Sequence, residues 1–542
     1  MNDHQTPRQE KVTLQRRIGP LSLLFAGISS IIGSGWLFGS MFAAQMAGPA
    51  AIISWVIGGA IMFVIAIVYA ETVSMLPAAG VIARIPFFTH GSLAGFTAGW
   101  LCLVTYLAAT PIEVIAVLDY ASNYVPSLTT TEEGERVLTI EGLIIAALLL
   151  AVFTAINLKG AHWLATANSA ITVWKLLIPS IVPIALFVFA FDGDHFSDYS
   201  GFAPYGTAGI FAAVSSGGVL YALSGFRAML DLAGEARNPQ RDIPLALMGA
   251  IGICTLLYLV LQIAFIGAVP ESYLAMGWSG ISEAAPGGPF AAIVGLLGLK
   301  WLALLIYIDA AVSPGGTGLA YSGATARLDY GMAKNGHLPK IFARLNRNGV
   351  PAWALLANLV VGLIMLAPFP NWREMISFIT SAAHLSLAFG PISLIALRLQ
   401  MPDRPRPFRI PFAMLTAALA MVLISWVLYW TGWNTNWKAL IAVAVGVAVF
   451  ATLRWLRGQR GEPANVRQMA WFAPYLALIA TTSYLGNYGG GIGLVPEWLD
   501  MAIIAVGALA IFALAIRLRL PDEDAKALVA QTNVETQTRG KI

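Results

Sequence analysis

Residues 29–40 read SSIIGSGWLFGS, and they interrupt a long apolar run with two glycines, Gly33 and Gly35, on either side of Ser34. Glycine is about 1 kcal/mol less favourable than alanine inside a helix. A helix in hydrocarbon has no water to replace the backbone hydrogen bonds that it gives up. This stretch therefore predicts a membrane helix that is broken in its middle, unless the two glycines serve only as a close contact between helices.

The composition places the whole chain in a membrane. Its 542 residues are 58% hydrophobic and 11% charged, whereas soluble domains carry about 25% charged residues. We expect an all-α polytopic membrane protein with about fourteen transmembrane helices, and with twelve as the alternative. The predicted spans are residues 21–44, 50–76, 92–125, 138–157, 162–190, 208–233, 244–268, 299–325, 351–368, 374–399, 411–431, 438–456, 469–485 and 498–517.

The lysines and arginines predict the direction of these spans. When the N-terminus is placed in the cytoplasm, 26 of the 32 basic residues fall on the cytoplasmic side, as expected for the loops of a membrane protein. The same distribution accounts for the net charge of +4 without nucleic-acid binding. We therefore predict a multi-pass protein of the cell (inner) membrane with both termini cytoplasmic. Its predicted parts are an N-tail at 1–19, a transport core of ten spans at 20–400, additional spans at 401–517 and a C-tail at 518–542, of which 521–542 is expected to be flexible.

A second predicted span, residues 208–233, carries a similar interruption. Its sequence AGIFAAVSSGGVLYALSGFRAMLDLA contains Gly217-Gly218 and then Ser224-Gly225. Interruptions in the first and sixth spans indicate two inverted repeats of five spans with a binding site between them. The freed N–H groups at a helix break favour a carboxylate, and the freed carbonyls accept from an ammonium group. A free amino acid carries both groups on one carbon, so the two breaks favour an amino acid site.

Several segments resemble the amino acid–polyamine–organocation (APC) superfamily, and in particular its bacterial proton-coupled members of the aspartate–proton symporter type. The resemblance rests on IIGSGW in the first span, AETVSMLPAAG (70–80), YALSGFRAMLDLAGEARNPQRDIP (221–244), YGMAKNGHLPKIFARLNRNGVP (330–351) and MPDRPRPFRIP (401–411). It implies the leucine-transporter fold, alternating access and a substrate site between the first and sixth spans. The residues that it implies for this site are Gly33, Ser34 and Gly35 at the substrate carboxylate, Ile31 and Tyr221 to Leu223 at the ammonium, and the adjoining Ser224 and Gly225. Tyr221 also falls where family members often have an aromatic gate.

Arg227 departs from the family pattern, in which an acidic residue commonly follows the Gly-aromatic pair. An arginine near the site would suit a substrate with an acidic side chain, because a guanidinium pairs with a carboxylate through two parallel hydrogen bonds. The alternative is that Arg227 pairs with Asp231 one helical turn away and never meets the substrate. Aspartate or glutamate is thus the preferred prediction for the substrate.

Lys175 is the main candidate for coupling transport to a proton. It lies deep in the fifth predicted span, and ionisable residues inside a membrane usually mark ion pathways. It resembles the lysine that proton-coupled superfamily members carry where sodium-coupled relatives bind sodium. A structural role, bonding the carbonyls of the broken first span, is compatible with this. Secondary candidates are Glu113, Asp309 and His384, of which Asp309 could pair with Lys175 or Arg227; Glu71 is interpreted as structural.

These features together predict a secondary transporter that imports an amino acid by proton symport. An exchanger without ion coupling is the first alternative, and a nutrient sensor built on a transporter fold is the second. The six histidines are scattered without ligand spacing, so we expect no metal site and no enzymatic activity. No phosphate-binding loop of the GxxxxGK[ST] type is present, and we expect no cofactor. The expected partners are the amino acid, the proton and the lipid bilayer; the sequence does not predict an oligomeric state.

Overall fold

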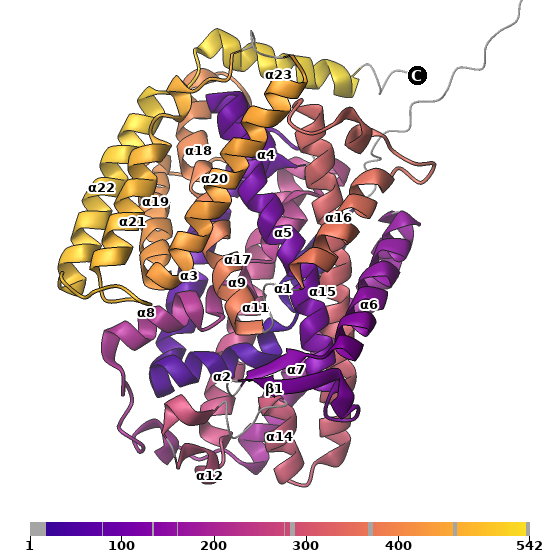
Figure 1. The fold of residues 1–542 in the computed structure, drawn as a ribbon, viewed down its shortest axis with the longest axis vertical. Coiled ribbons are helices and arrows are strands. Elements are labelled where there is room, and N and C mark those ends of the chain that lie inside the picture. The colour runs from indigo at the N-terminus through magenta and orange to yellow at the C-terminus, as the bar shows by residue number, and fades with distance from the viewer. Residues whose placement is uncertain are drawn as a thin grey trace, which may run out of the picture.

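A computed structural model describes residues 18–537 of the chain apart from 79, 133–134, 160, 276, 282–287, 367–371 and 459–462. These residues form a bundle of helices with a two-stranded hairpin, which lies above α14 in the lower part of the view in Figure 1. The predicted N-tail falls almost entirely on residues 1–17, which lie outside the described residues, as do residues 538–542 of the predicted C-tail.

The helices follow the predicted spans closely. The first half contains α1 (Pro20–Ile31), α2 (Gly35–Ala47), α3 (Ala51–Met75), α4 (Val81–His90), α5 (Ser92–Ala121), β1 (Thr129–Glu132), β2 (Glu135–Leu138), α6 (Ile140–Leu158), α7 (Ala161–Phe189), α8 (Gly206–Ser216), α9 (Val219–Leu223), α10 (Phe226–Leu230) and α11 (Pro239–Ala268). The second half contains α12 (Glu271–Leu274), α14 (Pro289–Leu296), α15 (Lys300–Lys334), α16 (Ala352–Met365), α17 (Trp372–Leu387), α18 (Phe389–Gln400), α19 (Ala413–Thr431), α20 (Trp433–Leu456), α21 (Phe472–Leu485), α22 (Glu497–Arg517) and α23 (Asp522–Gln537). Each of the fourteen predicted segments therefore contains a helix.

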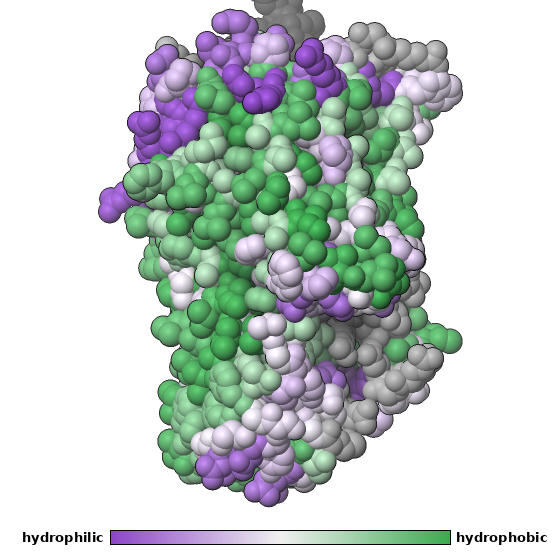
Figure 2. Space-filling model, turned by 90° about the vertical axis from the view of Figure 1, so that its left-hand side faces the viewer, coloured by the Kyte–Doolittle hydropathy of each residue, from purple (hydrophilic) through white to green (hydrophobic). Residues whose placement is uncertain are grey.

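Length and composition support a multi-pass membrane protein. Ten helices in the described residues are long and apolar enough to cross a membrane, and the bent pair Gly206–Ser216 and Val219–Glu235 would make eleven. The space-filling view shows a broad apolar belt between polar groups gathered toward the two ends of the molecule (Figure 2). The chain is thus an all-α polytopic membrane protein. The count of fourteen spans and the five-plus-five repeat stay predictions.

Several elements lie outside the predicted spans, namely helices α4, α12, α14 and α23 and strands β1 and β2. Strands β1 and β2 pair antiparallel, with Thr129 opposite Leu138. Helix α23 occupies the segment expected to be flexible, and it buries Ala525 and Val529 while packing against α18 and α4. The expectation of a flexible C-tail is therefore wrong for residues 522–537, because this polar segment carries enough apolar side chains on one face to dock on the bundle.

Glu71 ties three parts of the bundle together at the end of α3. Its carboxylate accepts two hydrogen bonds from Arg398 at the end of α18, at 2.8 and 2.7 Å, and one from the backbone N–H of Ile410 at 2.7 Å. The guanidinium of Arg406 adds an ion pair at 3.6 Å. Glu71 is almost fully buried, so its charge depends on these partners. The contacts agree with the structural role predicted for this residue.

Glu71→Ala is expected to destabilise the protein by about 3 kcal/mol, because it leaves Arg398 and Arg406 without their carboxylate. The measurement is thermal unfolding of the purified protein in a mild detergent. Glu271→Ala, the same change at an exposed position of α12, is the matched control. Equal unfolding temperatures for the two variants would contradict the prediction.

Candidate functional site

The predicted break in the first span is present. Helix α1 ends at Ile31 and α2 begins at Gly35, so Ile32, Gly33 and Ser34 separate two helical halves. The backbone of Ile32 is extended, with φ −82° and ψ 97°. A side chain at Gly33 would meet the carboxylate of Glu113 and the hydroxyl of Thr317. The break therefore exposes the carbonyl end of α1 and the N–H end of α2 to side chains from other helices.

Lys175 closes the carbonyl end of the break. Its Nζ donates to the carbonyl oxygens of Ser29 at 2.7 Å and Ile32 at 2.8 Å, and to Oγ1 of Thr317 at 2.8 Å. Thr317, on α15, lies 3.0 Å from the same two carbonyl oxygens, although its single hydroxyl hydrogen serves only one of them at a time. Lys175 is fully buried, and three hydrogen bonds satisfy its ammonium group. The predicted contact with the broken span is confirmed, while a role in proton coupling stays a prediction.

Ile31 was expected to receive the substrate ammonium through its carbonyl oxygen. In the structure this oxygen accepts a hydrogen bond from the hydroxyl of Tyr258 on α11, at 3.0 Å. Together with the bonds from Lys175 and Thr317, this leaves the last carbonyls of α1 bonded to side chains of three surrounding helices. The first helical half is thus held in place by the chain itself.

A carboxylate lies at the N–H end of the break. Oε2 of Glu113, on α5, accepts from the backbone N–H of Ser34 at 2.8 Å, and Oε1 accepts from the hydroxyl of Tyr221 at 2.9 Å. The indole N–H of Trp372, on α17, donates to Oγ of Ser34 at 2.9 Å. The start of α2 favours negative charge, because its N–H groups are unpaired and its dipole is positive there. Glu113 therefore occupies the type of position that was predicted for the substrate carboxylate.

The second interrupted span breaks at two places. Helix α8 ends at Ser216, α9 follows from Val219, and α10 starts at Phe226 after Ser224 and Gly225. Gly218 has φ +88°, a conformation that residues with side chains rarely adopt. Tyr221 and Leu223 lie buried in α9, and the hydroxyl of Ser224 bonds back to the carbonyl of Tyr221 at 2.8 Å. Both predicted breaks are thus present in the structure.

The two interrupted spans touch through two glycines. A side chain at Gly225 would overlap the carbonyl group of Ser30, and a side chain at Gly35 would lie 2.7 Å from the Cβ of Ala222. No neighbouring side chain can move aside at Gly225, because the group in the way is backbone. The absence of side chains at these positions lets the spans approach at backbone contact distance.

Arg227 does not form the ion pair that was considered for it. Its guanidinium lies 3.4 Å from the carbonyl oxygen of Ser224 and 3.3 Å from Oγ1 of Thr105, and it sits over the ring of Tyr106. Neither carboxylate oxygen of Asp231 has a hydrogen-bond partner among the described residues. The pairing of Arg227 with Asp231 is therefore wrong, since the shorter contacts of the guanidinium lead to α5 instead.

The other ionisable candidates lie in separate hydrogen-bonded settings. Asp309 accepts from the indole N–H of Trp36 at 2.9 Å and from the hydroxyl of Ser313 at 2.8 Å, and it makes no ion pair with Lys175 or Arg227 among the described residues. Nδ1 of His384 lies 2.7 Å from the carbonyl oxygen of Thr380, its own helical neighbour. Of the secondary candidates, the structure brings only Glu113 to the break.

Three residues at the break were missed by the sequence analysis. Thr317 lies in the small-residue stretch SPGGTG of α15, where a lone hydroxyl among glycines could have drawn attention. Tyr258 and Trp372 gave no such signal, because aromatic residues are common in every apolar span of this chain. In the structure the ring of Trp372 meets that of Tyr221 edge to face at 5.6 Å and stacks on Phe42 at 5.4 Å. The structure thus places Trp372 against the ring of Tyr221, while the gating role of Tyr221 stays a prediction.

The polar groups at the break come from several different helices. The described residues contain no group of three His, Cys, Asp or Glu side chains that could hold a metal ion. Every polar group named at the break is a hydrogen-bond donor or acceptor placed by a different helix. Such an arrangement suits a small molecule that carries a carboxylate and an ammonium group.

Comparisons with known proteins show which family this chain belongs to. A family model described as amino acid permease matches residues 18–450. The chain is 37% identical to the glutamate/serine transporter AimA of Bacillus subtilis (strain 168) over 526 residues, which cover 96% of this chain and 97% of that protein. It is 35% identical to the aspartate-proton symporter of the same organism over 512 residues, 94% and 97% of the two chains. It is also 26% identical to the methylthioribose transporter of that organism over 449 residues, 81% and 93% of the two chains. The family match and the two relatives above 30% identity show that the chain belongs to the amino acid permease family.

Proposed function

We propose that this permease imports an acidic amino acid, aspartate or glutamate, together with a proton, by alternating access across the cell membrane with both termini in the cytoplasm. Two kinds of observation support this. The similar proteins include one named for glutamate and serine and one named for aspartate and a proton. The lysines and arginines gather on the side that the proposed topology assigns to the cytoplasm.

The proposal depends most on one observation, the hydrogen bond that the carboxylate of Glu113 accepts from the backbone N–H of Ser34. It marks the start of α2 as a place that binds carboxylates. The substrate α-carboxylate would take this place, and its ammonium group would lie toward Ile31 and the carbonyls of α9. The two carboxylates would then compete for one N–H donor, and they would repel each other if both were charged.

Protonation of Glu113 would relieve this competition. A neutral carboxyl group is a weaker acceptor and carries no charge to repel the substrate. Binding of the proton and binding of the amino acid would thus favour each other, which is the thermodynamic requirement of symport. Lys175 would contribute by holding a fixed ammonium group on the opposite side of the break, and Asp309 and His384 remain secondary candidates.

Glu113→Gln is expected to remove the pH dependence of substrate affinity. In the unmodified protein the apparent KM should fall by about tenfold on acidification, which corresponds to roughly 1.4 kcal/mol of competition at one charge-assisted hydrogen bond. Glutamine is neutral at every pH, so the KM of the variant should be low and constant between pH 6 and pH 8. The measurement is initial uptake of labelled aspartate into proteoliposomes. Asp119→Asn, on the same helix but bound to Arg136, is the control and should keep the pH dependence.

We propose that Arg227 gives the transporter its preference for acidic substrates. Its guanidinium is buried, and its hydrogen bonds in the described part of the chain are made only to neutral oxygens at 3.3 and 3.4 Å. A buried guanidinium without a carboxylate is poorly compensated, and a substrate carboxylate would supply the missing charge. This pairing needs the substrate side chain to reach from the break toward α10.

The experiment that tests the proposed function is uptake in proteoliposomes with labelled aspartate, glutamate, serine, leucine and arginine, with and without an inward proton gradient. Symport is expected to give concentrative uptake of aspartate or glutamate that depends on the gradient. Uptake that does not depend on the proton gradient but requires amino acid inside the proteoliposomes would instead identify an exchanger. Binding without any uptake would identify a sensor.

A further inference from the structure

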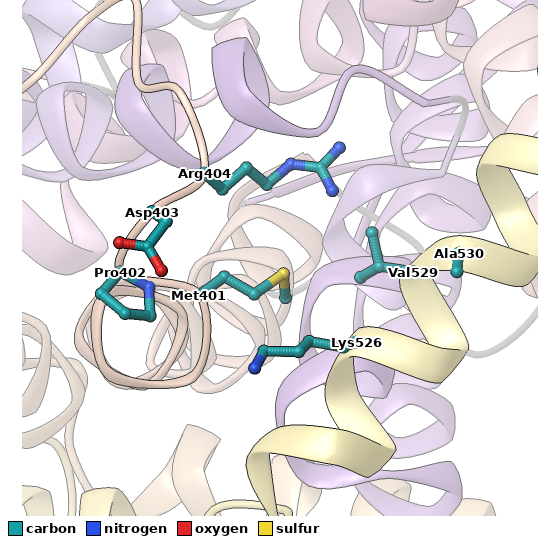
Figure 3. Close-up of a pocket in the computed structure, with 7 residues that line it drawn as sticks. All are labelled: Met401, Pro402, Asp403, Arg404, Lys526, Val529 and Ala530. Atoms are coloured by element: carbon teal, nitrogen blue, oxygen red, sulfur yellow. The ribbon is translucent and has the colours of Figure 1, made fainter.

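A cavity of about 250 Å³ lies between the end of α18 and helix α23, away from the break in the spans. Its walls are Met401, Asp403 and Arg404 from the segment that follows α18, and Lys526 and Val529 from α23 (Figure 3). Figure 3 shows the side chains of Arg404 and Lys526 on opposite sides of Met401. The volume is somewhat below the range of about 300–1,000 Å³ typical of ligand pockets, so it suits a small group.

The wall that presents Arg404 is built by Arg406. The guanidinium of Arg406 donates to the carbonyl oxygens of Leu397, Met401, Pro402 and Arg404, at distances of 2.8 to 3.1 Å. These four bonds fix the backbone on both sides of Arg404. A site whose backbone is ordered before binding loses less conformational freedom when a ligand arrives.

The opposite wall is formed by α23, and hydrogen bonds just before the start of this helix hold it to the core. The side-chain amide of Gln400 donates to the carbonyl oxygens of Thr89 at 3.1 Å and Leu520 at 2.8 Å, and the N–H of Leu520 donates to Thr89 at 2.8 Å. Lys526 follows on this helix, where it is half-exposed and, within the described part of the chain, makes one long ionic contact of 3.8 Å with the exposed Glu523. Such an exposed pair contributes little, so Lys526 is available to a ligand.

The charged side chains that line the cavity are Arg404, Lys526 and Asp403, which together carry a net charge of +1. Arg404 makes no hydrogen bond or ion pair through its guanidinium among the described residues, and burial lowers its pKa below the ordinary value. The pKa of Arg406 is lowered by burial, and the charges of Arg398, Arg409 and Arg404 add to this, whereas Glu71 alone opposes it. Glu71 is already paired with two of these arginines, Arg398 and Arg406.

We propose that this cavity binds a phosphate-bearing anion, with Arg404 and Lys526 as its cationic ligands on opposite walls. The buried side chains of Met401 and Val529 would contact the carbon part of the molecule. The positive charge of the chain assigns this end to the cytoplasm, where the anion is either the head group of an anionic phospholipid or a soluble phosphate ester. Occupancy joins α23 to the end of α18, and so it stabilises the folded protein by mass action.

The test is the thermal unfolding of the full-length protein in a neutral detergent. The probes are dioctanoyl phosphatidylglycerol, dioctanoyl phosphatidylcholine, glycerol 3-phosphate and inorganic phosphate. The variants are Arg404→Gln, Lys526→Gln and the double variant, with Arg409→Gln as the control because Arg409 belongs to the same segment but does not line the cavity. Lys526→Gln changes only the half-exposed side of α23, so it stays informative if Arg404→Gln does not fold.

Stabilisation by phosphatidylglycerol alone is expected for a lipid site, and stabilisation by phosphate or its glycerol ester for a soluble ligand. Either single variant should weaken the apparent affinity by about tenfold, as expected for the loss of one charge-assisted hydrogen bond. Arg409→Gln should leave it unchanged. The proposal is overturned if no phosphate-bearing probe stabilises the protein, if phosphatidylcholine acts as well as phosphatidylglycerol, or if Arg409→Gln has the same effect as the cavity variants.

Discussion

Gly225→Ala is expected to reduce uptake by at least about tenfold. The new methyl group would overlap the carbonyl group of Ser30 in the neighbouring interrupted span. Overpacking of this kind costs about 1–3 kcal/mol, and here the group in the way is backbone beside the break, so relief would move the carbonyls that Lys175 holds. The measurement is initial uptake of labelled aspartate into proteoliposomes, with thermal unfolding recorded in parallel.

The matched control is Gly252→Ala in α11, where a methyl group would meet nothing within 4 Å. This change should preserve uptake and slightly favour the helix. Uptake by Gly225→Ala at the rate of the unmodified protein would show that the two interrupted spans do not touch as described.

Lys175→Met is the second change with a large expected effect. It removes the donor for the carbonyl oxygens of Ser29 and Ile32 and for the hydroxyl of Thr317. A buried acceptor left without a partner costs about 1–3 kcal/mol, and Thr317 can serve only one of the two carbonyls. We expect concentrative uptake to fall by more than about tenfold. Lys300→Met, at the exposed start of α15, is the control.

The same variant separates the two roles of Lys175. If it couples the proton, the variant should still exchange labelled for unlabelled substrate at equal concentrations but should no longer accumulate it under a proton gradient. If it only supports the break, exchange and accumulation should be lost together. Full accumulation of substrate by the variant would show that Lys175 is needed neither for proton coupling nor for support of the break.

The sequence predicted those features of the site that have a local cause. Gly33 and Gly35 weaken one helix and Gly217-Gly218 another, and both helices are broken there. Lys175 was identified because it lies deep in an apolar span, where ionisable residues usually mark ion pathways, and bonding to the carbonyls of the broken span was considered as its structural role. In each case the reason lies within one segment of the chain.

The features that the sequence did not predict depend on which helices meet. Trp372 contacts Ser34 although the two residues are 338 positions apart in the sequence. No pattern within α17 indicates that contact. Arg227 has an acidic residue at the helical spacing that favours pairing, yet tertiary packing turns it toward Thr105. Glu113 was placed among secondary candidates because its partners, Ser34 and Tyr221, come from two other spans. The docking of α23 likewise depends on a surface formed by α4 and α18.

The contacts of Gly225 with Ser30 and of Gly35 with Ala222 have a mechanical consequence. Two interrupted spans that meet at backbone distance on both sides of their breaks cannot slide past each other without a steric clash, so we expect them to move as one unit. Under the proposed alternating access, we therefore expect flanking helices, such as α17 with Trp372, to open the site by moving away from this pair. Labels that report distances across the pair should stay constant while labels on α17 change.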